Sequence, residues 1–170
     1  MKILLDIDGV MIPARPWQTY QMSSDGFGMF NNLSVKSLND IINSSQNPEI
    51  ILSTSHKHSY SLKQWENIFS SRGIIKTKIS RLNTNSMKTS RIEEVRSWHL
   101  KNQNKDFIII DDDKGLNALE TSFKKEHLVL TNATIGLNKF SKEEAINKIE
   151  NILESIDFEM PEIESTKLDR

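Results

Sequence analysis

Carboxylates follow directly on two apolar runs of this sequence, in positions where they could bind a metal ion or take part in acid–base chemistry. The first run leads into Asp6-Ile7-Asp8-Gly9, and a later run, Phe107-Ile108-Ile109-Ile110, leads into Asp111-Asp112-Asp113. Acids that abut a buried strand cost free energy unless they are paired or bind a cation. A hard divalent cation with oxygen ligands would remove the repulsion among such carboxylates, and Mg²⁺ fits best.

Three hydroxyl side chains, Ser53-Thr54-Ser55, follow another apolar run, Glu49–Leu52. Neighbouring side chains on a strand point to opposite faces, so only one of Ser53 and Thr54 can face a site that the acids share. We favour Ser53 for that position.

Five short apolar or β-branched runs predict strands that would position these residues. They are Lys2–Ile7, Glu49–Leu52, Ile74–Ile79, Asp106–Ile110 and His127–Leu130. Several are apolar at successive positions, as expected for strands covered on both faces. Helical segments alternate with them, which predicts an α/β fold: a single Rossmann-like three-layer domain with about five parallel strands and helices on both faces. In such sheets ligands bind outside the carboxyl ends of the strands, where the acids stand.

Five helices are expected from apolar residues at helical spacing. Their marker residues are Leu33, Leu38, Ile41 and Ile42; Leu62, Trp65, Ile68 and Phe69; Ile92, Val95, Trp98 and His99; Leu116, Leu119 and Phe123; and Ala145, Ile149, Ile152 and Leu153. Ser34 is expected to cap the first helix, and Ser141 with Glu144 to form a capping box at the last. Residues 1–155 then form one domain, and residues 156–170 form a loosely attached polar tail.

Composition excludes several classes of protein. The 170 residues carry 22 Lys and Arg against 23 Asp and Glu, so the protein has no overall basic charge that would bind nucleic acid by bulk electrostatics. A local basic face is compatible with this balance. The absence of cysteine excludes disulfides, thiolate zinc sites and a cysteine nucleophile. No apolar run approaches the roughly 20 residues that cross a bilayer, and the N-terminus is unlike a signal peptide. We therefore expect no membrane association and a cytoplasmic location.

The strand-end segments resemble the haloacid dehalogenase-like (HAD) phosphohydrolase superfamily. The resemblance rests on LLDIDGVMIP, IILSTSH, Lys88 and FIIIDDD, which appear in the order of the four motifs of that superfamily and cover residues 2 to about 140. The chain is most similar to small bacterial members without a large cap, which share a strand-end pattern like IILSTSH and a late Gly136-Leu137. Some of those members resemble domains found with nucleic-acid end-repair enzymes.

The resemblance implies a phosphatase that works through an aspartyl-phosphate intermediate. Asp6 would be the nucleophile, and Asp8 the general acid and then the general base. Ser53 would donate a hydrogen bond to a phosphoryl oxygen, and Lys88 would neutralise the charge on nucleophile and phosphate. Arg91 is an alternative to Lys88, because a difference of one turn leaves both on the same helix face.

The same resemblance implies a magnesium site. Asp6 and Asp111 would bind Mg²⁺ through their side chains and Asp8 through its backbone carbonyl, with Asp112 either a direct ligand or just outside the ligand set. Asp113 is more simply explained as the cap of a helix expected at Lys114–Lys125.

Further residues beside the motifs are candidates for binding the substrate. They are Gly9, Thr54, His56 and Arg91. Members of the superfamily tend to carry Trp at the His56 position, so this chain departs from them on the leaving-group side. The polar run His56–His58 could bind the phosphate or the leaving group, or be an ordinary polar loop.

An aromatic segment, Pro13–Phe30, occupies the position of the flap that lies beside the site in this superfamily. Trp17, Tyr20, Phe27 and Phe30 could stack on a nucleobase, although aromatic side chains on a short hairpin more often serve packing.

The intervals between motifs limit the kind of substrate. Neither the interval from Asp8 to Ser53 nor that from Ser53 to Lys88 can hold an additional cap domain, which needs roughly 50 residues. An open site of this kind suits a phosphate on a bulky partner such as a nucleic-acid end or a protein, unless oligomerisation supplies a lid.

The leading hypothesis is a Mg²⁺-dependent phosphatase for such a phosphomonoester. The alternatives are a nucleic-acid end-processing phosphatase and a catalytically silent protein that binds Mg²⁺ or phosphate.

Overall fold

The computed structural model describes residues 1–74, 77–83, 89–103 and 106–159, and within them it contains one five-stranded sheet. The strands are β1 Lys2–Leu5, β2 Glu49–Leu52, β3 Lys78–Arg81, β4 Phe107–Asp111 and β5 Leu128–Leu130. All pairings are parallel and the order is β3-β2-β1-β4-β5. The predicted parallel α/β fold is therefore confirmed.

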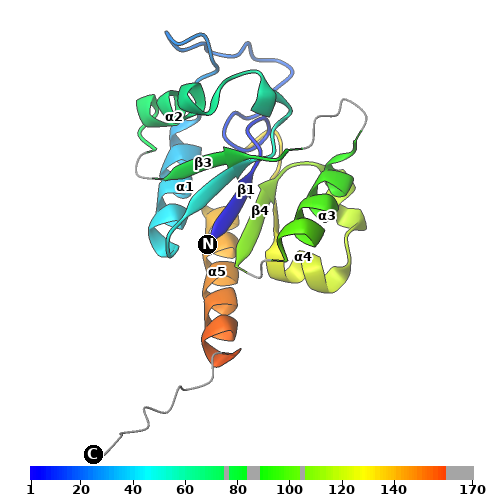
Figure 1. The fold of residues 1–170 in the computed structure, drawn as a ribbon. Helices are drawn as coiled ribbons and strands as arrows, with labels where there is room; N and C mark the ends of the chain where they lie inside the picture. The colour runs from blue at the N-terminus through cyan, green and yellow to red at the C-terminus, as the bar shows by residue number, and fades with distance from the viewer. Residues whose placement is uncertain (75–76, 84–88, 104–105, 160–170) are drawn as a thin grey trace, which may run out of the picture.

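Helices cover both faces of the sheet (Figure 1). They are α1 Asn32–Ser44, α2 Leu62–Ser71, α3 Arg91–Asn102, α4 Thr121–His127 and α5 Lys139–Glu159, with 3₁₀ turns η1 Ser55–His58 and η2 Lys114–Ala118. One hydrophobic core joins Ile3 and Leu5 to α1, α2 and α5, and the other joins Leu4 to α3, η2 and α4. Burial on both faces explains why the central strands are continuous apolar runs.

The register places the site-bearing ends of three strands level with one another. Leu5, the last residue of β1, is opposite Leu52 of β2 and Ile110 of β4. From β1 the chain continues to β2 on one side of the sheet, and from β4 it continues to β5 on the other side. The gap between the carboxyl ends of β1 and β4 is therefore the position where open α/β sheets bind ligands.

Two predicted helix caps are wrong. The side chain of Asn31, not that of Ser34, caps α1 by accepting a hydrogen bond from the Leu33 N–H at 2.8 Å, and Ser34 is buried in the first turn of the helix. At α5 the Asn138 side chain accepts from the Phe140 and Ser141 N–H groups, and the Ser141 hydroxyl accepts from the Asn138 N–H. Asn competes equally well with Ser for the cap position, so the helices begin one turn earlier than expected.

The predicted third strand begins too early. Ile74 instead closes α2, because its N–H donates to the Phe69 carbonyl while the Gly73 N–H donates to Ser70, with Gly73 at a φ of +80°. This is a Schellman motif, and only glycine adopts that backbone conformation easily. The strand β3 runs from Lys78 to Arg81.

Three further boundaries differ from the sequence prediction. The helix expected at Lys114–Lys125 is divided into η2 and α4, and Asp113 caps the first of these by accepting a hydrogen bond from the Gly115 N–H at 2.7 Å. His127 ends α4 rather than beginning a strand. The helix α5 continues to Glu159, past the expected domain end at residue 155, and residues 160–170 lie outside the described residues.

The flap, Pro13–Phe30, lies beyond the carboxyl edge of the sheet (Figure 1). Phe27 and Phe30 are buried and pack edge to face against aromatic residues of α2, as the packing interpretation expects. Trp17 and Tyr20 behave differently, because they stay 75% and 49% exposed. No described helix is both long enough and apolar enough to cross a membrane.

Candidate active site

Three carboxylates meet at the carboxyl ends of β1 and β4. Asp6, Asp111 and Asp112 each place one oxygen within 4.8 Å of the others. The Asp6 N–H donates to the Ile110 carbonyl at 3.0 Å, which holds Asp6 against β4 beyond the last residue of β1. Such a set of hard oxygen donors could hold a Mg²⁺ ion.

Burial raises the pKa values of the carboxyl groups in this cluster. The pKa of Asp6 rises to about 7, mainly because the group is buried, and the charge of Asp111 adds to the rise. Burial likewise raises the pKa of Asp111 to about 6. Arg91 opposes both shifts without cancelling them. Burial therefore makes the ionised form of these carboxylates costly, and a divalent cation bound between them would favour that form.

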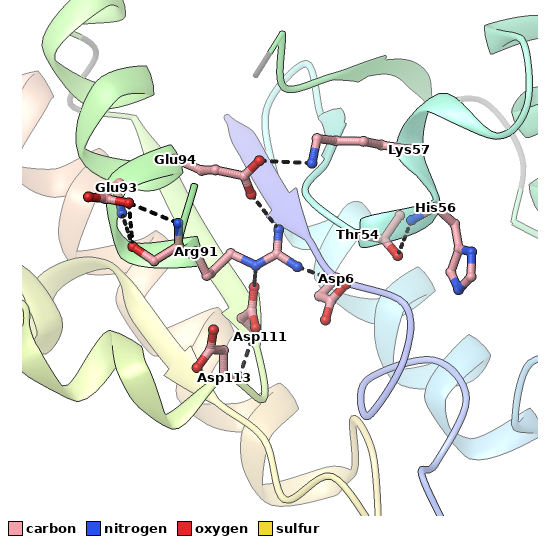
Figure 2. A network of polar contacts seen from close by, with 10 residues as sticks. Asp6, Thr54, His56, Lys57, Arg91, Glu93, Glu94, Asp111 and Asp113 are labelled. Carbon is pink, nitrogen blue, oxygen red and sulfur yellow. Dashed lines mark hydrogen bonds and ion pairs between the residues drawn. The ribbon is translucent and has the colours of Figure 1, made fainter. Parts of the chain in front are cut away.

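Arg91 is the cation that reaches this cluster from the described residues (Figure 2). It is the first residue of α3, after the N-cap Ser90, whose hydroxyl and Glu93 form a capping box. Its Nε lies 3.0 Å from Asp111 Oδ2 and its Nη2 lies 3.4 Å from Asp6 Oδ1. The first contact is an ion pair whose alignment is too poor for a hydrogen bond. Lys88, the other candidate for this role, lies outside the described residues.

A buried ion-pair chain, which sequence reasoning missed, extends behind Arg91. Glu94 Oε2 accepts from Arg91 Nη1 at 3.0 Å, and Glu94 Oε1 accepts from Lys57 Nζ at 2.9 Å (Figure 2). Lys57 and Glu94 are only 6% and 4% exposed. The spacing of Arg91 and Glu94 by three positions on a helix was a signal for their pairing, but nothing local indicated their burial.

The two candidate hydroxyls have different environments. Ser53 and Thr54 are both fully buried. The Thr54 hydroxyl caps η1 by accepting from the His56 N–H at 3.4 Å. Among the described residues, Ser53 Oγ has no hydrogen-bond partner, and the Ser53 backbone N–H is bonded to the Leu5 carbonyl at the end of β1. Ser53 thus has a donor to spare at the end of β2, next to the end of β1 from which Asp6 follows.

Asp8 is not part of the carboxylate cluster, although its charge is near enough to help raise the pKa of Asp112, which burial raises most. Its Oδ2 is 3.1 Å from His56 Nε2, and both side chains are partly exposed, whereas Asp6 is buried. His56 in turn lies edge-on to Phe27 of the flap. The two acids of the first motif therefore have different partners: Asp6 belongs to the carboxylate cluster, whereas Asp8 contacts His56 on the side of the flap.

Gly9 allows the sharp turn between these two environments. Its φ is +73°, and a Cβ at this position would lie 2.3 Å from the carboxylate carbon of Asp112. The Gly9 carbonyl accepts from the Thr131 hydroxyl at 2.9 Å, a contact from the end of β5 that sequence reasoning missed.

The Asp113 backbone N–H donates to Asp111 Oδ1 at 2.9 Å, so the backbone of the third acid in the run Asp111–Asp113 orients the side chain of the first (Figure 2).

A family model described as "HAD domain in Swiss Army Knife RNA repair proteins" matches residues 2–141. No curated protein and no solved structure matches the chain. The matched region spans all five strands, and it confirms the resemblance that the strand-end motifs indicate.

Proposed function

Because the chain belongs to the family of HAD domains in Swiss Army Knife RNA repair proteins, we propose that it is a Mg²⁺-dependent phosphatase that removes a terminal phosphate from RNA. One observation carries this proposal. Asp6 and Asp111 are buried, with carboxylate oxygens within 4.8 Å of one another and of Asp112, and among the described residues the Ser53 hydroxyl at the end of the neighbouring strand β2 has no hydrogen-bond partner. A cluster of oxygen ligands with a spare donor on the next strand suits a metal ion and a phosphoryl group.

In the proposed reaction Asp6 attacks the phosphorus atom. An Asp6 Oδ–phosphorus bond forms as the bond from phosphorus to the leaving alcohol oxygen breaks, and Asp8 gives that oxygen a proton. Asp8 then takes a proton from the water that attacks the aspartyl-phosphate, which releases inorganic phosphate and restores Asp6. The contact between His56 and Asp8 supports this role, because it would hold the Asp8 carboxyl on the leaving-group side.

The metal would be held by Asp6, Asp111 and Asp112, with the Asp8 carbonyl as a further ligand. Mg²⁺ bound there would neutralise charge on the phosphoryl oxygens. Ser53 would donate a hydrogen bond to one of these oxygens. Arg91 would supply further positive charge, and Glu94 with Lys57 would hold its guanidinium in place. Lys88 remains a second candidate for the cationic role.

Two observations support an RNA end over a small metabolite as the substrate. The description of the matching family places its HAD domains in RNA repair proteins. Beyond the carboxyl edge of the sheet the described fold has the flap but no additional domain, and such an edge gives access to a phosphate on a large molecule.

Phosphate release from terminally phosphorylated RNA, phosphopeptides and sugar phosphates, with Mg²⁺ or with EDTA, tests the proposal. We expect RNA to be the best substrate and EDTA to stop turnover. Asp6→Asn should abolish turnover, whereas Asp40→Asn, on α1 in a pair with Lys142, should retain it. Turnover that persists in Asp6→Asn would rule out Asp6 as the nucleophile. Mg²⁺ binding with no turnover of any substrate would favour the catalytically silent alternative.

A further inference from the structure

The flap and the start of α1 enclose an open cavity of about 320 Å³. This volume is at the lower end of the range for small-molecule sites, which is roughly 300–1,000 Å³. Its apolar lining comes from Ile12, Pro13, Met29 and Phe30. None of the residues that line it belongs to the carboxylate cluster, so the cavity is separate from the metal site.

The cavity adjoins the site on the side of Asp8. Ile12 lines it, pairs with Asp8 in an isolated β-bridge, and accepts a hydrogen bond from the Gly9 N–H at 2.8 Å. Tyr20 lines it as well, and burial, followed by the charges of Asp8 and Asp112, raises the pKa of the Tyr20 hydroxyl. A group that leaves toward Asp8 would therefore move toward this cavity.

The polar lining has the chemistry of a nucleobase site. Four carboxamides line the cavity, from Gln18, Gln21, Asn31 and Asn32, and no carboxylate does. Within the described part of the chain, the side chains of Gln21 and Asn32 make no hydrogen bond. A carboxamide offers a donor and an acceptor together, which matches the edge of a base, and the Tyr20 ring can stack on its face.

The walls of the cavity are fixed at both ends of the flap. At one end the Ala14 N–H donates to Ala133 at 2.7 Å and Arg15 Nε donates to Thr134 at 3.1 Å. At the other end the Asn31 N–H donates to the Met11 carbonyl at 2.9 Å. A binding site on fixed supports loses less conformational entropy when it takes up a ligand.

We infer that this cavity binds the nucleobase of the nucleotide whose phosphate is removed, with Tyr20 stacked on the base and Gln21 and Asn32 on its edge. The inference rests on the proposed function and extends it, since it locates the specificity for nucleic acid in the flap rather than in a basic surface.

The test compares two short RNAs that differ only in the terminal phosphorylated nucleotide, which carries a base in one and is abasic in the other. Both 5′- and 3′-phosphorylated pairs are used. For the end that is cleaved, we expect the wild-type kcat/KM to be about tenfold higher with the base present, mainly through KM. Tyr20→Ala should bring this ratio near one, and Gln21→Ala should reduce it. Leu100→Ala, which removes a 73% exposed side chain near the end of α3, should leave the ratio unchanged.

Binding of the same RNAs without phosphate, measured by fluorescence anisotropy, separates this inference from the proposed function. If no RNA is hydrolysed but wild-type protein prefers the base-bearing end and Tyr20→Ala does not, the cavity assignment holds although the phosphatase assignment fails. Equal binding and turnover of base-bearing and abasic ends would overturn the inference. A phosphopeptide hydrolysed faster than RNA, with an equal loss in Tyr20→Ala, would overturn it too.

Discussion

Arg72 and Arg91 are both largely buried, with side chains 7% and 12% exposed, but their surroundings differ. Arg72 lies at the end of α2 and donates to both carboxylate oxygens of Asp25 and to the carbonyls of Phe27, Gly28 and Ile68. Arg91 lies at the start of α3 and faces Asp6, Asp111 and Glu94, with poor alignment to Asp111.

The pKa values of the acids beside the two arginines differ in direction. The hydrogen bond from Arg72 is the main cause that lowers the pKa of Asp25 to about 2, whereas burial is the main cause that raises the pKa of Asp6 to about 7 and of Asp111 to about 6, and Arg91 does not cancel it. Arg72 meets one carboxylate and several neutral carbonyls, so its charge is matched. Arg91 meets three carboxylates, so negative charge remains. Removing one partner of a matched buried pair destabilises the fold, and an unmatched cluster of buried acids is a candidate for binding a cation or a substrate.

Exchanging each arginine for methionine should separate the two roles. We expect Arg91→Met to lower kcat for phosphate release from RNA by roughly 10²- to 10³-fold, because a charge aimed at the reacting group is lost. Arg72→Met should lower turnover per folded molecule by less than tenfold. Steady-state kinetics with both variants, corrected for the folded fraction by circular dichroism, provides the measurement. Equal losses in the two variants would contradict the division of roles.

The free energy of unfolding should show the reverse order, with a larger loss in Arg72→Met than in Arg91→Met. Arg72→Met leaves the Asp25 carboxylate and the flap carbonyls of Phe27 and Gly28 without their donor, and we expect a loss of about 3 kcal/mol in the free energy of unfolding. Arg91→Met should cost less, since the carboxyl groups it leaves can take up protons. Urea unfolding at pH 6 with EDTA compares the two. A larger loss for Arg91→Met than for Arg72→Met would refute the contrast.

The raised pKa of Asp6 predicts a pH-dependent stability in metal-free protein. Between its ordinary value of 3.8 and about 7, the folded state holds a proton that the unfolded chain has released, so stability falls as pH rises through this window. Asp6→Asn cannot ionise. We therefore expect it to be more stable than wild type at pH 8, by about 1 kcal/mol or more, and equal to it near pH 4. Urea titrations in EDTA at both pH values measure this.

Magnesium gives the matching control for Asp6→Asn. Mg²⁺ should raise the unfolding free energy of the wild type at pH 8 and have little effect on Asp6→Asn, because the ion would lose a ligand. A wild type that is more stable than Asp6→Asn at pH 8 in EDTA would show that the cluster is already neutralised.

The sequence was sufficient to predict the sheet and the gathering of acids. A strand buried on both faces must be apolar throughout, so Phe107–Ile110 stands out, and parallel strands bring their carboxyl ends to one edge. The structure accordingly brings Asp6 and Asp111 together. The separate position of Asp8 depends on the positive φ of Gly9 and on His56, which no periodicity reveals.

Local signals could not settle features that depend on tertiary contacts. Glu94 and Lys57 resemble solvent-exposed charges on a helix and a loop, and only the packing of α3 against the sheet buries them. The cap of α1 had two competent candidates within one turn. The hydrogen bond from the Asn31 N–H to Met11 fixes the backbone there and selects Asn31 over Ser34.

The smallest predicted effect is that of Asp25→Asn, and its pH dependence has the opposite sign to that of Asp6→Asn. The pKa of Asp25 is lowered, so its stabilising contribution is present above 3.8 and disappears as pH falls toward about 2. The Asp25 side chain is 31% exposed and solvent screens the pair, so we expect a loss of about 1 kcal/mol or less at pH 7. In urea titrations, the difference in unfolding free energy between wild type and Asp25→Asn should be smaller at pH 3 than at pH 7. A deficit that is constant or grows would mean that Asp25 supports the flap through its bond from the Phe27 N–H rather than through its charge beside Arg72.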